Sequence, residues 1–137
     1  MPLCIIQAGR SSQRIARDEQ PLKANADRIP TLRPAFRSDG TVTAANSSSI
    51  SDGAAALVLM PMDEAQRRGL APRARIVAHA THAQEPAWFT TAPVGAIRKL
   101  FERTGWNADE VDLYEINEAF AVVTMAAMQA LDLPHDK

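Results

Sequence analysis

The feature that most limits the fold of this chain is its longest apolar stretch without a charged residue, residues 119–131. A membrane-spanning helix needs roughly 20 such residues, so this stretch is too short to cross a bilayer. A helix that is apolar on every side is instead buried on every side within a protein. We therefore expect no membrane association and a helix enclosed by other elements of a core.

The segments before this helix alternate between two periodicities. Apolar runs and alternating patterns predict strands over residues 54–60, 74–83 and 111–116. Helices are predicted between the strands, the first over residues 63–69 and the second from Pro93 to a stop at Gly105. This alternation predicts an α/β fold. Sites in such folds usually lie where strands end and helices begin, which indicates residues 46–53 and 117–120.

Residues 1–40 differ from the remainder because they lack a sustained apolar period. Pro21, Pro30 and Pro34 each restrict the conformation of the preceding residue, so we predict loops and short irregular elements here. The N-terminal apolar stretch is too short for a signal peptide, and its arginines follow it. We expect a cytoplasmic chain.

The composition argues against several functional classes. The formal net charge is -1, without the basic footprint of a nucleic-acid binder, so we expect no nucleic-acid partner. The single cysteine, Cys4, cannot form an internal disulfide. His79, His82 and His135 show no metal-ligand spacing, so we predict no metal site.

Several short motifs occur together in a characteristic order. They are Leu-Arg-Pro-Ala-Phe at residues 32–36, Asp-Gly-Thr-Val-Thr-Ala at 39–44, Asn46, Asp-Gly-Ala-Ala-Ala at 52–56 and Asn-Glu-Ala-Phe-Ala at 117–121. This set resembles thiolase signatures over roughly residues 15–137, whereas the first dozen residues match no thiolase segment that we could place. The resemblance implies a partial thiolase-like fold, with layered sheets and buried helices, incomplete in this chain.

The same resemblance implies how the chain is organised. Residues 1–40 would correspond to the end of the thiolase loop region, 41–70 to the last elements of the N-terminal half, and 71–137 to the first part of the C-terminal half. The implied activity is acyl transfer between acyl-CoA and CoA, with CoA as a substrate and no cofactor.

By resemblance, Asn117 holds a water that helps form an oxyanion hole for the thioester carbonyl. A developing oxyanion needs neutral, oriented donors, and removal of one such donor typically costs about 10²–10³ in rate. The alternative is that Asn117 merely caps the helix that follows, as asparagine does well.

Four further residues are candidates for binding CoA or its acyl group. Ser48 matches a serine that lines the pantetheine arm, and Asn46 shapes the same loop; the alternative is a generic polar turn. Phe120 would pack near the acyl site, which is compatible with plain core packing. Phe89 lies in a stretch that borders the CoA entrance, although an aromatic here could equally cover a core edge.

The chain lacks other residues that the chemistry requires. Thiolase catalysis needs a nucleophilic cysteine, a histidine in a Gly-His-Pro context and a second cysteine, which the family carries upstream of residue 1 and downstream of Lys137. We expect the isolated chain to be inactive, and to form a homo-oligomer or to require the missing thiolase segments as a partner. The alternatives are a non-catalytic remnant or interaction module of thiolase ancestry, and an unrelated α/β binding domain.

Overall fold

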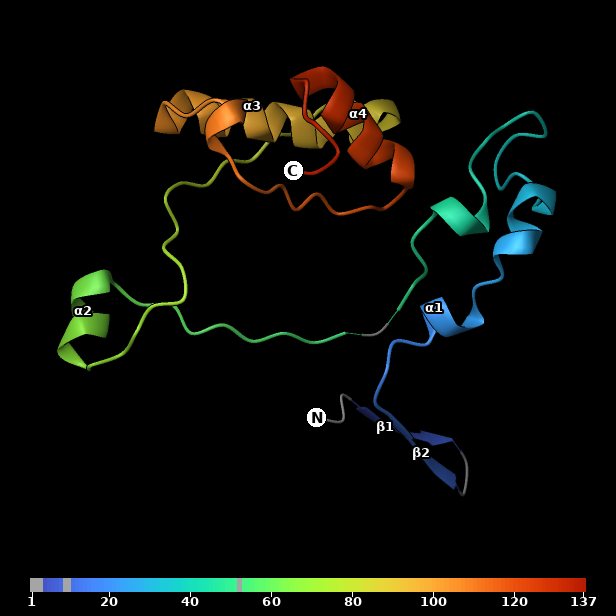
Figure 1. The fold of residues 1–137 in the computed structure, drawn as a ribbon, viewed down its shortest axis with the longest axis horizontal. Helices are drawn as coiled ribbons and strands as arrows, with labels where there is room; N and C mark the ends of the chain where they lie inside the picture. The colour runs from blue at the N-terminus through green and yellow to red at the C-terminus, as the bar shows by residue number, and fades with distance from the viewer. Residues whose placement is uncertain (1–3, 9–10, 52) are drawn as a thin grey trace. The chain divides into compact units, whose positions relative to one another are not determined.

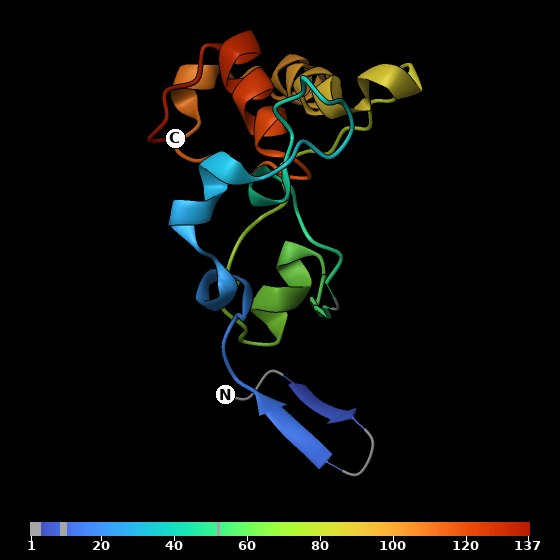
Figure 2. The same cartoon turned by 90° about the vertical axis from the view of Figure 1, so that its right-hand side faces the viewer.

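The computed structural model describes residues 4–8, 11–51 and 53–137, and the chain divides into two compact units, Met1–Arg33 and Pro34–Lys137 (Figure 1, Figure 2). Within these described residues no helix is both long and apolar enough to cross a membrane.

The first unit begins with a β-hairpin. Strands β1 (Cys4–Ala8) and β2 (Ser11–Ile15) pair antiparallel, with Cys4 opposite Ile15 and Ala8 opposite Ser11. Our prediction of loops and irregular elements over residues 1–40 is therefore wrong for this segment. Strands of 5 residues are too short to show a convincing period of two, although Ile5 and Ile6 of β1 favour extended backbone. Two short turns follow, α1 (Gln20–Lys23) and the 3₁₀ helix η1 (Ala26–Thr31).

The second unit is built around two helices that lie side by side (Figure 1, Figure 2). They are α3 (Ala92–Thr104) and α4 (Ala121–Leu131), and both were predicted from the sequence. Helix α3 ends at Gly105, whose φ of 75° is left-handed and whose amide donates to the Phe101 carbonyl at 2.8 Å. The buried side chains of this pair are Val94, Val123, Ala127 and, just after α4, Leu133.

The remaining elements of this unit are short. They are the 3₁₀ helices η2 (Ala44–Asn46), η3 (Pro86–Thr91) and η4 (Ala108–Glu110), and the helix α2 (Met62–Arg67). Helix α2 confirms the helix predicted over residues 63–69. Turn η4 begins with a capping box between Asn107 and Glu110, a local signal that also predicts it from the sequence.

The three strands predicted in this unit do not pair. Residues 54–60, 74–83 and 111–116 are without regular secondary structure and belong to no sheet among the described residues. Many of their apolar side chains are exposed, with Leu57 at 86%, Ile76 at 70% and Leu113 at 75%. The apolar pattern identifies segments suited to a buried strand, but a strand forms only where a neighbouring strand supplies the other half of its hydrogen bonds.

The uncharged helix is not buried on every side within this chain, contrary to what its apolar composition alone would predict, and it leaves an exposed apolar surface. Val123 and Ala127 of α4 are 4% and 0% exposed, but Val122 and Met125 are 50% and 63% exposed. Packing against α3 and η3 covers one stripe of α4 and leaves the stripe with Val122 and Met125 exposed.

Candidate functional site

Asn117 lies in the turn that leads into α4. Helix α4 begins at Ala121, and its N-cap residue is Phe120, which has extended backbone and no side-chain capping bond. Asn117 therefore does not cap this helix, and the capping alternative is wrong. Inside the turn, the Ala119 amide donates to the Asn117 carbonyl at 3.0 Å. The Asn117 side chain is exposed and makes no hydrogen bond to any described residue.

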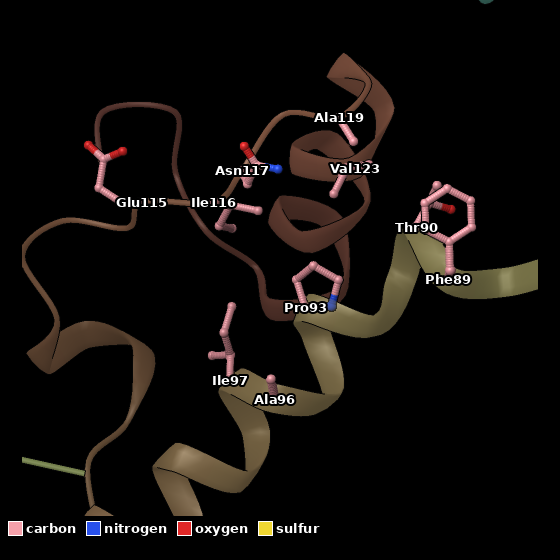
Figure 3. A pocket seen from close by; sticks show the side chains of 10 residues that line it. All are labelled: Phe89, Thr90, Pro93, Ala96, Ile97, Glu115, Ile116, Asn117, Ala119 and Val123. Atoms are coloured by element: carbon pink, nitrogen blue, oxygen red, sulfur yellow. The ribbon is translucent and has the colours of Figure 1, made fainter. Parts of the chain in front are cut away.

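The Asn117 side chain lines a cavity of about 390 Å³ between the start of α3 and the turn before α4 (Figure 3). Its lining residues are Phe89, Thr90, Pro93, Ala96, Ile97, Glu115, Ile116, Asn117, Ala119 and Val123. Most of the wall is apolar, so the Asn117 amide is a neutral hydrogen-bonding group set among hydrocarbon side chains. Such a cavity, apolar with few polar groups, is typical of small-molecule sites.

Sequence reasoning missed part of this cavity. Pro93, Ala96 and Ile97 of α3 were assigned to a helix, but not to the site. Their spacing of three and four residues places them on one face of the helix, and that face meets Val123 of α4 across the cavity. The spacing was visible in the sequence, whereas the partner that the face meets was not.

The polar loop before residue 50 is organised by its own side chains. The Thr43 amide donates to Asn46 Oδ1 at 2.8 Å, and Asn46 Nδ2 donates to the Thr41 carbonyl at 2.9 Å. The Ser47 hydroxyl donates to the Thr43 carbonyl at 2.7 Å. The side chain of Asn46 thus fixes the shape of the loop from within.

This loop is joined directly to the Asn117 turn. The Ser48 amide donates to the Ala119 carbonyl at 3.0 Å, and the Ser48 hydroxyl donates to the Glu118 carbonyl. An isolated antiparallel bridge pairs Ser47 with Phe120. Two motifs that are distant in sequence are therefore adjacent in the fold.

Phe120 contacts a residue of the first motif. Its ring packs edge-to-face against that of Phe36, with centroids 6.0 Å apart and planes at 78°. Such aromatic pairs contribute about 0.5–1.5 kcal/mol beyond the area that they bury. Phe120 is half-buried, so it holds Phe36 against the turn.

Phe89 reaches the site from the other side. It lies in η3 and lines the cavity together with Asn117, although 56% of its surface is exposed. Gln84 stabilises η3, because its Nε2 donates to the Trp88 carbonyl and to Thr91 Oγ1. The structure therefore brings Phe89 and Asn117 to one cavity, whereas Asn46, Ser48 and Phe120 do not line it. Ser48 is bonded to the turn that follows Asn117, and Asn46 belongs to the same loop as Ser48.

The electrostatics of the cavity are mild. Its lining includes one ionisable side chain, Glu115, which Figure 3 shows at the margin of the group. Next to it in the sequence, burial raises the pKa of the Tyr114 phenol, and the Asp109 carboxylate raises it further. Among the described residues no group of histidine, cysteine, aspartate or glutamate side chains could hold a metal ion.

Two family models match the chain. The model "Thiolase, N-terminal domain" matches residues 1–63, and "Thiolase, C-terminal domain" matches residues 70–137. The first match begins at residue 1, so the resemblance extends further towards the N-terminus than the motifs alone indicated.

Relatives and solved structures agree with these models. A probable acetyl-CoA acetyltransferase of Dictyostelium discoideum is 46% identical over 97% of the chain and 32% of the relative. The crystal structure of the Bacillus anthracis acetyl-CoA acetyltransferase matches with a TM-score of 0.89 and 41% identity, covering 97% of this chain and 34% of that one. The Acat5 thiolase of Ascaris suum in complex with coenzyme A matches with a TM-score of 0.85 and 39% identity, over 88% of this chain and 32% of that one. The chain thus spans about a third of the length of these proteins.

Proposed function

The chain belongs to the thiolase family, and from that premise we propose that it serves thiolase-type acyl transfer between acyl-CoA and CoA. Support comes from relatives named acetyl-CoA acetyltransferase and from a similar thiolase structure that contains coenzyme A. CoA is a substrate in this proposal, and no cofactor is required.

The observation that carries the proposal is the position of Asn117. Its amide is neutral, is not used as a helix cap and lines an apolar cavity. A donor of this kind does not titrate, and it can orient a water towards the oxygen of a thioester as negative charge develops there. We assign Asn117 the role of holding this water in the oxyanion hole.

We propose that four residues support the binding of CoA and its acyl group. Phe89, which is exposed at the cavity, provides an apolar surface for the pantetheine arm. Ser48 and Asn46 shape the loop on which that arm would lie, and Phe120 packs beneath the acyl site. In this arrangement Phe89 contacts the ligand directly, and Asn46 acts through the loop.

The isolated chain should bind but not turn over. Acyl transfer through a covalent intermediate needs an activated nucleophile and a base. The sequence contains 1 cysteine and 3 histidines, none in a Gly-His-Pro context. Cys4 lies in β1, outside the unit that contains the cavity. This observation also favours the second candidate function, a non-catalytic remnant or interaction module of thiolase ancestry.

The exposed apolar segments lead us to propose a protein partner. Leu57, Val58 and Leu59 are 86%, 85% and 71% exposed, and large contiguous apolar patches are uncommon on monomers. We propose that these segments complete layered sheets, either in a homo-oligomer or with the remaining segments of a thiolase. A cytoplasmic location stays a prediction.

The first test is a thiolysis assay with acetoacetyl-CoA and CoA, together with calorimetric binding of acetyl-CoA. We expect no turnover, and binding that Asn117→Ala weakens roughly fivefold, the loss of about one hydrogen bond. Gln129→Ala is the control, because it removes an amide from the exposed end of α4 outside the cavity lining. If the chain turned over and Asn117→Ala abolished that turnover, the expectation that the isolated chain is inactive would be wrong, and Cys4 would be the next residue to mutate. Absence of binding would refute a CoA site.

A further inference from the structure

Ser48 connects the two motifs of the site. Its amide donates to the Ala119 carbonyl and its hydroxyl to the Glu118 carbonyl, so both contact the turn after Asn117 from a distant part of the sequence. We infer that the Ser48 hydroxyl is a positioning group that holds the Asn117 turn in place. This inference rests on the role proposed for Asn117.

The geometry makes the contact specific to the hydroxyl. A serine hydroxyl has one hydrogen to donate, and here the Glu118 carbonyl accepts it. The acceptor is main chain, so the contact fixes the backbone of the turn directly and does not depend on the Glu118 side chain. The lone pairs of the Ser48 oxygen stay available to accept a hydrogen bond from another group.

Asn117 depends on such a contact because little else orients it. Its side chain makes no hydrogen bond to a described residue, and the N-cap position of α4 belongs to Phe120. The backbone of residues 117–119 therefore sets the point and direction from which the Asn117 side chain leaves the main chain. A donor in an oxyanion hole acts by being fixed in advance, and a displacement of about 1 Å can cost on the order of 10²-fold in rate.

The neighbouring serine provides a matched control. The Ser47 hydroxyl donates to the Thr43 carbonyl at 2.7 Å, a bond contained within its own loop. Ser47→Ala and Ser48→Ala thus each remove one hydroxyl from adjacent positions and one bond to a main-chain carbonyl. Only Ser48→Ala removes a bond to the Asn117 turn.

The test is amide hydrogen exchange by NMR on the full chain, with the Ala119 amide as reporter and the Gly105 amide as reference. Ser48→Ala should accelerate exchange at Ala119 roughly fivefold and shift the side-chain amide resonances of Asn117. Gly105, which is held by Phe101 at the end of α3, should be unchanged. Ser48→Thr restores a hydroxyl and should keep exchange at Ala119 near the wild-type rate, which a role in packing alone would not predict.

Two results would overturn the inference. One is equal acceleration at Ala119 in Ser47→Ala and Ser48→Ala, and the other is a wild-type Ala119 amide that exchanges without protection. Neither result depends on ligand binding. Failure to bind acetyl-CoA would refute the proposed function, while the exchange data would still decide whether Ser48 holds the turn.

Discussion

Replacing Gly95 with alanine should destabilise α3, although alanine is the better helix former. A Cβ at this position would lie 2.5 Å from Cδ2 and Nε2 of His82 and 2.6 Å from its Cε1. Favourable contacts between carbon atoms begin at about 3.5 Å, so the imidazole would have to move by about 1 Å. The ring is held in place, because its Nε2 lies 3.2 Å from Gln84 Oε1.

The magnitude follows from three opposing effects. Alanine in a helix interior gains about 1 kcal/mol over glycine. Overpacking costs about 1–3 kcal/mol, and breaking the bond between His82 and Gln84 costs about 1 kcal/mol more. Gly95→Ala should therefore lower the free energy of unfolding by about 1–3 kcal/mol. In a His82→Ala background the clash is absent, and the same substitution should stabilise by about 1 kcal/mol.

The assay is a double-mutant cycle in urea, with unfolding followed by circular dichroism for the wild type, Gly95→Ala, His82→Ala and the double variant. The opposite signs in the two backgrounds give an expected coupling energy of about 2–4 kcal/mol. Stabilisation by Gly95→Ala to the same extent in both backgrounds would refute the reasoning, because the His82 ring would then not occupy the space beside Gly95.

Three further predictions concern other parts of the second unit. Gly105→Ala should lower the free energy of unfolding by about 1 kcal/mol, because φ at this position is 75° and no other atom of the described residues lies close enough to oppose a side chain. Gly105→Asn should lower it by less in thermal unfolding, since asparagine tolerates this conformation, and equal losses for the two variants would contradict the reasoning. Burial and the Asp109 carboxylate raise the pKa of Tyr114 above 10.0, so the unfolded chain loses this proton first. The stability that Tyr114 contributes is therefore present below pH 10.0 and is lost as the pH rises through its folded pKa. In urea titrations on both sides of this pH, the free energy of unfolding should fall less with rising pH in Tyr114→Phe than in the wild type. Met125→Glu, at a position 63% exposed, should reduce self-association in analytical ultracentrifugation, and an unchanged sedimentation profile would argue against α4 as the contact.

The elements that the sequence predicts correctly are those with local signals. Helix α3 ends at Gly105 because glycine accepts a left-handed φ, and η4 begins at Asn107 because its side chain bonds two residues ahead. Both signals lie within a few positions of the structure that they determine. The strands predicted over residues 54–60 and 111–116 depend on a distant neighbour, which the apolar pattern cannot supply.

The same distinction between local and distant signals applies to the site. Asn117 could be identified from its motif, and its exclusion as a helix cap follows only from the observed start of α4 after Phe120. The contact between Ser48 and Glu118 joins positions 70 residues apart, which no local pattern encodes. The role of Ile97 in the cavity emerges only when the face of α3 is seen to meet α4.

The uncovered stripe of α4 has a consequence for how a partner would recognise it. The helix has no acidic residue in its first turn and no basic residue in its last, and its sequence contains no charge. Salt would have no ion pair on this helix to screen. Sulfate or phosphate salts strengthen apolar burial by exclusion from the protein surface. The affinity of a partner for the exposed stripe of α4 would thus increase as such salts are added. The fit and the area of the apolar surface, and not charge, would determine which partner binds.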